Sequence, residues 1–83
     1  MEKDLICQKV EHFIMEQFVF DQDQGVDKDE SLLESGTVDS TGMLEVVLFL
    51  EENFSIKVKD EEMVPDNLDS VNRITDYIAG KIG

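Results

Sequence analysis

Apolar residues recur at steps of three and four positions in three stretches of the chain, which predicts three long helices. The stretches run from about Glu2 to Phe18, from Ser40 to Asn53 and from Ser70 to Lys81. A short helix or turn is expected near Asp60 to Val64, with Pro65 ending it, because proline disfavours the helical conformation in the residue before it. The predicted fold class is all-α: a small four-helix bundle with three long helices and one short helix.

The stretch from Ser40 to Asn53 is more apolar than a helix on a protein surface needs to be. Between Met43 and Leu50 only Glu45 is polar. An amphipathic surface helix has about half that apolar coverage. We therefore expect this helix either to be buried on more than one side or to expose apolar surface to a partner.

A long polar loop separates the first two expected helices. It runs from Asp21 to Asp39 and holds 19 residues, among them two glycines and seven acidic residues. Connections of this length are uncommon inside small domains and are usually functional or mobile. Leu32 and Leu33 are expected to attach its middle to the core. Its first acidic residues resemble a calcium loop, but Gly25 stands where an EF-hand needs an oxygen ligand, so no metal site is predicted.

Charge narrows the classes of partner. The chain has 83 residues, enough for one domain over 1–83, with 20 acidic residues, 7 basic residues and a net charge of −13. The segment 21–66 alone holds 14 acidic and 3 basic residues. This balance argues against nucleic acid or an anionic membrane as a partner, because both require clustered lysine and arginine. Proteins with basic surfaces are expected instead, although a merely solvated acidic face is the simpler alternative.

Cysteine and histidine usage gives no catalytic or metal site. Cys7 is the single cysteine and His12 the single histidine, so neither an internal disulfide nor a Cys/His metal site is predicted. The two residues lie near each other on the first expected helix, but no third group supports a nucleophile and base pair. The sequence shows no signal-peptide pattern and no apolar run of membrane-spanning length. A monomer in the cytoplasm is expected.

Ser40 stands at the junction of the long loop and the second expected helix. Either Asp39 or Ser40 suits the N-cap position, where a side-chain oxygen accepts a free backbone N–H. A helix N-terminus also favours an attached phosphate, through its unpaired N–H groups and its positive dipole end. From position alone, an ordinary capping serine is the simpler interpretation.

An Asp-Ser pair follows a sequence of leucine, acid, serine and glycine. Further short sequence segments downstream match one family pattern in order and in spacing. The segments are Ser31 to Ser40, Leu44 to Val47, Leu50 to Phe54, Val58 to Glu62, and Val71 with Ile74 to Ile78. In this order they resemble the acyl and peptidyl carrier proteins over nearly the whole chain.

The resemblance implies that Ser40, beside Asp39, carries a 4′-phosphopantetheine arm that a phosphopantetheinyl transferase attaches from coenzyme A. The thiol of the arm would hold an acyl or aminoacyl group as a thioester, and the protein itself would catalyse nothing. Ligases, synthases and transferases with basic docking patches are the implied partners. The residues expected to contact them are Asp39, Thr41, Glu45, Glu51, Glu52, Val58, Asp60 and Glu61.

Two departures from the family pattern point to a specialised carrier. Thr41 and Gly42 follow the serine, where fatty-acid carriers commonly have leucine and an acid. The segment from Met63 to Val71 is a longer lead into the last helix and is more similar to carriers of aminoacyl-transfer or polyketide-type pathways. The alternatives are a housekeeping fatty-acid carrier and a non-covalent acidic helical adaptor that uses Ser40 as a plain cap.

Overall fold

Four α-helices and one 3₁₀ turn form the part of the chain that the computed structural model describes, residues 2–18 and 27–82. They are α1 (Lys3–Phe18), α2 (Ser40–Phe54), the 3₁₀ turn η1 (Asp60–Glu62), α3 (Pro65–Leu68) and α4 (Val71–Ile82). No strand occurs in these two ranges. The predicted all-α bundle of three long helices and one short helix is confirmed. The first part of the long loop, with its calcium-like pattern, lies outside the described residues.

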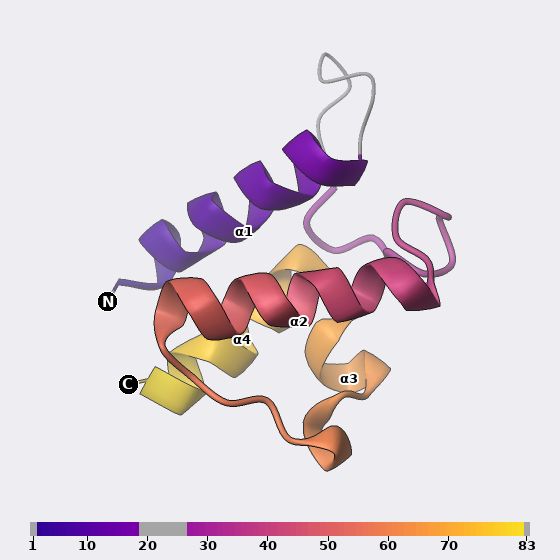
Figure 1. Cartoon of the computed structure of the whole chain (residues 1–83). Coiled ribbons are helices and arrows are strands. Elements are labelled where there is room, and N and C mark those ends of the chain that lie inside the picture. Colours follow the sequence, from indigo (N-terminus) through magenta and orange to yellow (C-terminus); the bar gives the residue numbers. More distant parts are fainter. Residues whose placement is uncertain (1, 19–26, 83) are drawn as a thin grey trace.

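The last helix lies at the centre of the arrangement. In Figure 1, α2 crosses in front of α4, while α1 runs above them and α3 lies to one side. Helix α4 packs against α1, α2 and α3. The end of α1 and the start of α2 lie on the side of the molecule opposite the two chain termini.

The core consists of the apolar residues that recur at helical spacing. The side chains with 2% exposure or less are Ile6, Val10, Ile14, Leu32, Val38, Val46, Leu50, Leu68, Val71, Ile74 and Ile78. Each such side chain contributes roughly 1.5–3 kcal/mol when it leaves water. Leu5, which the helical pattern places beside Ile6, is 44% exposed.

The second half of the long loop is fixed to the start of α4 through Asp69. The backbone oxygen of Asp69 accepts the Leu32 N–H at 2.6 Å. Its carboxylate accepts the Ser31 hydroxyl at 2.7 Å and the Leu33 N–H at 3.2 Å. Leu32 is buried, as expected, but Leu33 is 38% exposed, so the prediction that both leucines attach the loop to the core is wrong for Leu33.

A helical turn lies where the sequence predicts a short helix or turn, and a further short helix, which was not predicted, follows on the other side of Pro65. Residues Asp60–Glu62 form only the turn η1, and α3 begins at Pro65 itself. Proline suits the first position of a helix, because its missing N–H would have no partner there and its φ is already helical. The restriction on the preceding residue holds, since Val64 is extended with φ −123° and ψ 155°. The restriction therefore correctly ends the turn before Pro65, but the helix that begins at this proline was not predicted.

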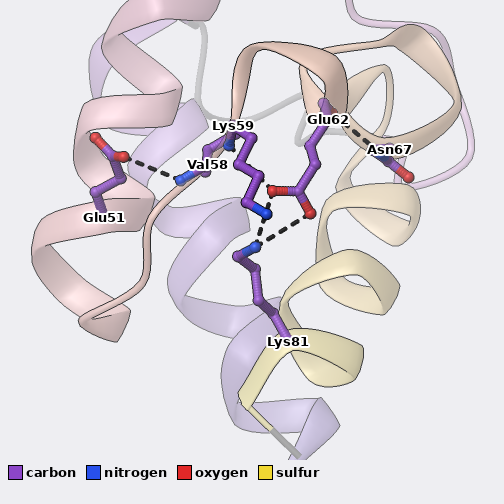
Figure 2. A network of polar contacts seen from close by, with 6 residues as sticks. All are labelled: Glu51, Val58, Lys59, Glu62, Asn67 and Lys81. Carbon is purple, nitrogen blue, oxygen red and sulfur yellow. Dashed lines mark hydrogen bonds and ion pairs between the residues drawn. The ribbon is translucent and has the colours of Figure 1, made fainter.

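Glu62 connects η1 to three other parts of the chain (Figure 2). Its carboxylate accepts the Lys59 N–H at 3.0 Å and both of its oxygens accept Lys81 Nζ, at 2.9 and 3.1 Å. Its backbone oxygen accepts Asn67 Nδ2 at 3.0 Å. The hydrogen bond from Lys81 is the main cause that lowers the pKa of Glu62, and the same bond raises the pKa of Lys81.

The ion pair between Glu62 and Lys81 predicts a pH-dependent contribution to stability. A carboxyl with a lowered pKa stabilises the fold above its ordinary value of 4.5, and this contribution disappears as the pH falls through the lowered value. We expect Lys81→Met to lower the Tm at pH 7, and the difference from wild type to shrink as the pH falls below 4.5. Thermal unfolding followed by circular dichroism measures this.

The matched control is Lys57→Met, which removes the same charge from an exposed lysine. Its Tm difference from wild type should change little over the same pH range. A Lys81→Met difference that stayed constant down to pH 3 would show that the pair adds no charge-dependent stability.

Candidate functional site

Ser40 is the first residue of α2, and Asp39 is the N-cap. Asp39 has extended φ and ψ angles of −94° and −177°, and its carboxylate Oδ1 accepts the Gly42 N–H at 2.6 Å. Of the two predicted capping residues, the structure therefore selects Asp39. Ser40 is exposed, and its hydroxyl forms no hydrogen bond with another residue of the described ranges. The hydroxyl is thus available for chemical modification.

The start of α2 provides an electrostatic environment that suits an anion. The N–H groups in the first turn of a helix have no partner within the helix, apart from those that a cap satisfies. Here the cap takes the Gly42 N–H, and the Met43 N–H donates to the Asp39 backbone oxygen at 2.9 Å. The N–H groups of Ser40 and Thr41 lie before these two residues in the helix and take no part in either bond. Together with the positive dipole end, they favour a phosphate attached to Ser40.

Gly42 allows the end of α1 to contact the first turn of α2. A Cβ atom at Gly42 would lie 2.8 Å from Phe18 Cε1, 3.2 Å from Asp39 Oδ1 and 3.2 Å from Val38 Cγ1. Gly42 is buried although it lies in an exposed turn. This contact explains why a residue without a side chain stands at position 42. The sequence analysis missed Phe18 as part of the site, and the small residues after Ser40 were the available signal.

Gly42→Ala should lower stability, against the usual preference of helices for alanine. Alanine gains about 1 kcal/mol over glycine in a helix, but the contact with Phe18 leaves no room for its methyl group. Overpacking costs about 1–3 kcal/mol, so we expect a net loss of about 1 kcal/mol in the free energy of unfolding. Urea denaturation measures it.

Gly80→Ala in α4 is the matched control, because a Cβ there meets nothing within 4 Å. It should raise the free energy of unfolding by roughly 0.5–1 kcal/mol. If both substitutions stabilised the protein equally, the contact between Phe18 and Gly42 would not constrain α2.

The outer face of α2 exposes apolar side chains between carboxylates. Leu44 and Leu48 are 54% and 59% exposed, and Glu45 and Glu52 are also exposed. Of the two alternatives for this helix, exposure of apolar surface is therefore correct. A shallow groove of about 390 Å³ runs beside this face. It is lined by Phe13, Gln17, Glu45, Leu48, Phe49 and Glu52.

Two predicted partner-contact residues, Glu51 and Val58, are bonded to each other. The Val58 N–H donates to Glu51 Oε2 at 3.0 Å, and both residues are half-buried. The Glu51 carboxylate thus holds the segment that follows α2 (Figure 2). Asp60 and Glu61 are exposed on η1. Of the other predicted contacts, Thr41, Glu45 and Glu52 are exposed along α2, a different element.

A small apolar pocket lies between α2 and the η1–α3 region. Its volume is about 70 Å³, and it is lined by Leu33, Met43, Met63, Val64, Pro65, Leu68 and Asp69. Met43 follows Ser40 by about one helical turn, so the pocket lies near the serine along α2. The sequence analysis missed this pocket, although the apolar run Met63-Val64-Pro65 in an acidic segment was a signal for it. For comparison, an engineered cavity of about 150 Å³ binds benzene, so a pocket of this volume suits a smaller group.

Neither a catalytic pair nor a metal cluster is found in residues 2–18 and 27–82. Cys7 is half-buried, while His12 is exposed and lies 3.1 Å from the Glu16 carboxylate. No group of three or more His, Cys, Asp or Glu residues could hold a metal ion within the described ranges. The helices of the same ranges are too short or too polar to cross a membrane.

An all-α bundle with an exposed serine at the start of its second helix is the arrangement that the carrier resemblance implies. No family model matches the chain. A D-alanyl carrier protein of Streptococcus uberis is 36% identical over 71 residues, covering 83% of this chain and 90% of that protein. A D-alanyl carrier protein of Streptococcus pyogenes serotype M1 is 34% identical over 67 residues, covering 78% and 85%.

The chain therefore belongs to the phosphopantetheine-binding carrier protein family. Like its relatives, it is a carrier and not an enzyme. Proteins of this family generally bear a covalent phosphopantetheine arm and work with ligases and transferases. The resemblance read from the sequence is confirmed at this level.

Proposed function

We propose that Ser40 carries 4′-phosphopantetheine and that the arm holds a D-alanyl group as a thioester for delivery to partner enzymes. The observation that carries this proposal is the exposed Ser40 hydroxyl at the start of α2. The identity of 34–36% to D-alanyl carrier proteins supports the choice of cargo. A housekeeping fatty-acid carrier is the alternative.

Each part of the site has a task in this proposal. Ser40 Oγ forms the phosphodiester to the arm, while the first turn of α2 stabilises the negative charge of the phosphate. Asp39 fixes this turn through the Gly42 N–H. The thiol of the arm forms the thioester with the carboxyl group of the cargo, which an ATP-dependent ligase activates. The protein contributes tethering, which raises the effective concentration of the cargo at each partner.

The pocket near the serine supports a small cargo. The side chain of a D-alanyl group is a single methyl, which a pocket of about 70 Å³ can accommodate. A long acyl chain would require the pocket walls to separate. The volume of the pocket is thus compatible with a D-alanyl group as cargo.

The proposed partners are a phosphopantetheinyl transferase and ligases, synthases or transferases that present lysine and arginine. The exposed apolar residues Leu44 and Leu48 add an apolar centre to the acidic rim, as docking surfaces commonly have. The proposed contacts remain Asp39, Thr41, Glu45, Glu51, Glu52, Val58, Asp60 and Glu61. We propose that this takes place in the cytoplasm, since the single half-buried cysteine suits a reducing compartment.

Modification at Ser40 can be tested by intact mass. Incubation with coenzyme A and a broad-specificity phosphopantetheinyl transferase should add one phosphopantetheine to wild type and none to Ser40→Ala. The substitution leaves the Asp39 cap in place, so the circular dichroism spectrum should stay unchanged. Addition to Ser40→Ala would mean that another residue bears the arm.

The cargo is tested on the product of that reaction. A ligase that activates D-alanine with ATP should add one alanyl group to the modified protein, and hydroxylamine should remove it because it is a thioester. L-alanine and octanoate serve as competitors. If the folded wild type accepted no arm, the result would favour the non-covalent acidic adaptor instead. In that case Ser40→Ala would still bind its partner.

Glu45→Lys tests the docking face. Reversing one charge at the rim of an interface is worth roughly 1 kcal/mol at low salt, so kcat/KM for the transferase reaction should fall about fivefold. Salt screens such contacts, so the difference should shrink at high ionic strength. Glu2→Lys makes the same charge change at the distant start of α1 and should have little effect. Equal kcat/KM values for the two variants would place Glu45 outside the interface.

A further inference from the structure

We propose that the ion pair between Glu62 and Lys81 restricts the cargo, by holding one wall of the pocket near Ser40 so that a longer acyl chain cannot enter. This inference rests on the proposed phosphopantetheine arm. It assigns a specificity-determining role to two residues that do not line the pocket.

One wall of the pocket is fixed. Met43 belongs to α2, and Leu33 is held by Asp69, which itself lines the pocket and accepts the Leu33 N–H at 3.2 Å. Asp69 also accepts the Ser31 hydroxyl and the Leu32 N–H, so the loop cannot withdraw without losing three hydrogen bonds. Leu32 is 2% exposed and attaches the same loop to the core.

The opposite wall is attached unevenly: Leu68 is part of the core and holds α3 against α4, whereas the segment before Pro65 is less buried. It consists of Met63, Val64, Pro65 and Leu68, which belong to a short extended segment and a four-residue helix. Leu68 is fully buried, but Val64 is 39% exposed and Met63 is only half-buried. Segments with few buried contacts open at low free-energy cost. The positions of Met63 and Val64 therefore depend on the polar attachments of the neighbouring residues.

The pair between Glu62 and Lys81 is the most shielded of the ion pairs in the described ranges. Their side chains are 26% and 24% exposed, whereas both partners of each other ion pair are more than half exposed. Exposed pairs contribute little because water and salt screen them. The Tyr77 ring adds to the shielding, with its centroid 5.6 Å from Lys81 Nζ. Among these pairs, this one is best suited to hold a segment in place.

Glu62 transmits this attachment to the pocket wall. It directly precedes Met63 in the chain, and its backbone oxygen accepts Asn67 Nδ2 from within α3. Figure 2 shows Lys81 at the end of α4 reaching the Glu62 carboxylate, while Asn67 approaches Glu62 from the other side. Loss of Lys81 would release η1 from α4 and allow Met63 to move away from α2. The pocket would then become wide enough for an acyl chain.

The first test uses the unmodified protein. Amide hydrogen exchange in residues 62–69 should be roughly tenfold faster in Lys81→Met than in wild type. Lys57→Met, the matched charge control, should exchange like wild type. Unchanged exchange in Lys81→Met would overturn the proposal whether or not the protein accepts an arm.

The second test varies the cargo. The transferase is supplied with octanoyl or D-alanyl coenzyme A, and the Tm of each product is compared with the form that carries the bare arm. In Lys81→Met the octanoyl group should raise the Tm by about 5 °C or more, because its chain becomes buried. In wild type and Lys57→Met neither cargo should raise the Tm. Equal octanoyl stabilisation of wild type and Lys81→Met would also overturn the proposal.

Glu62→Gln keeps an oxygen for the Lys59 N–H but removes the charge that holds Lys81. It should behave like Lys81→Met in both tests. Agreement between the two variants would show that the effect comes from loss of the ion pair and not from one particular substitution. If the transferase attached no arm to wild type, the proposed carrier function would fail while the exchange test still decided whether the pair holds the wall.

Discussion

The fold depends on the burial of one apolar stripe on α4. Val71, Ile74 and Ile78 have no exposed surface, and α4 is the helix on which α1, α2 and α3 all pack. A chain with a net charge of −13 repels itself in any compact state. Apolar burial has to overcome that repulsion. The few lysines that reach a carboxylate add a further stabilising attraction. Lys3 does so with Asp76, between α1 and α4.

The sequence was sufficient to predict the class of fold, because helical periodicity is a property of the sequence itself. It predicted the three long helices to within about two residues of their observed ends, the usual uncertainty at helix termini. It predicted the turn at Asp60–Glu62 but missed α3, because a proline is compatible both with the residue after a helix and with the first residue of one. Local sequence does not decide between these two positions. The packing of Leu68 against the core favours a helix after Pro65.

Some features of the candidate site could likewise be predicted from the sequence, whereas others depend on contacts in the folded chain. Ser40 and the acidic face were predicted from a pattern in the sequence, and the position of Ser40 on α2 agrees with it. The roles of Glu51 and Gly42 depend on residues distant in the chain, namely Val58 and Phe18, which only the folded chain brings into contact. Glu51 looked like a surface acid from its neighbours, but its carboxylate accepts a backbone hydrogen bond. A charge that is partly used within the protein offers less to a partner.

The contact between Phe18 and Gly42 has a consequence for how such a carrier can change in evolution. Phe18 ends α1 and Gly42 lies in the first turn of α2, so the two ends of the long connection are joined at one point. The entropy of closing a loop grows only slowly with its length, by about 0.6 kcal/mol for each doubling. Insertions that leave Leu32, Val38 and the bonds to Asp69 in place would therefore cost little closure entropy, and the serine would keep its place. The length of the connection can diverge outside these attached residues, whereas its two end points cannot move.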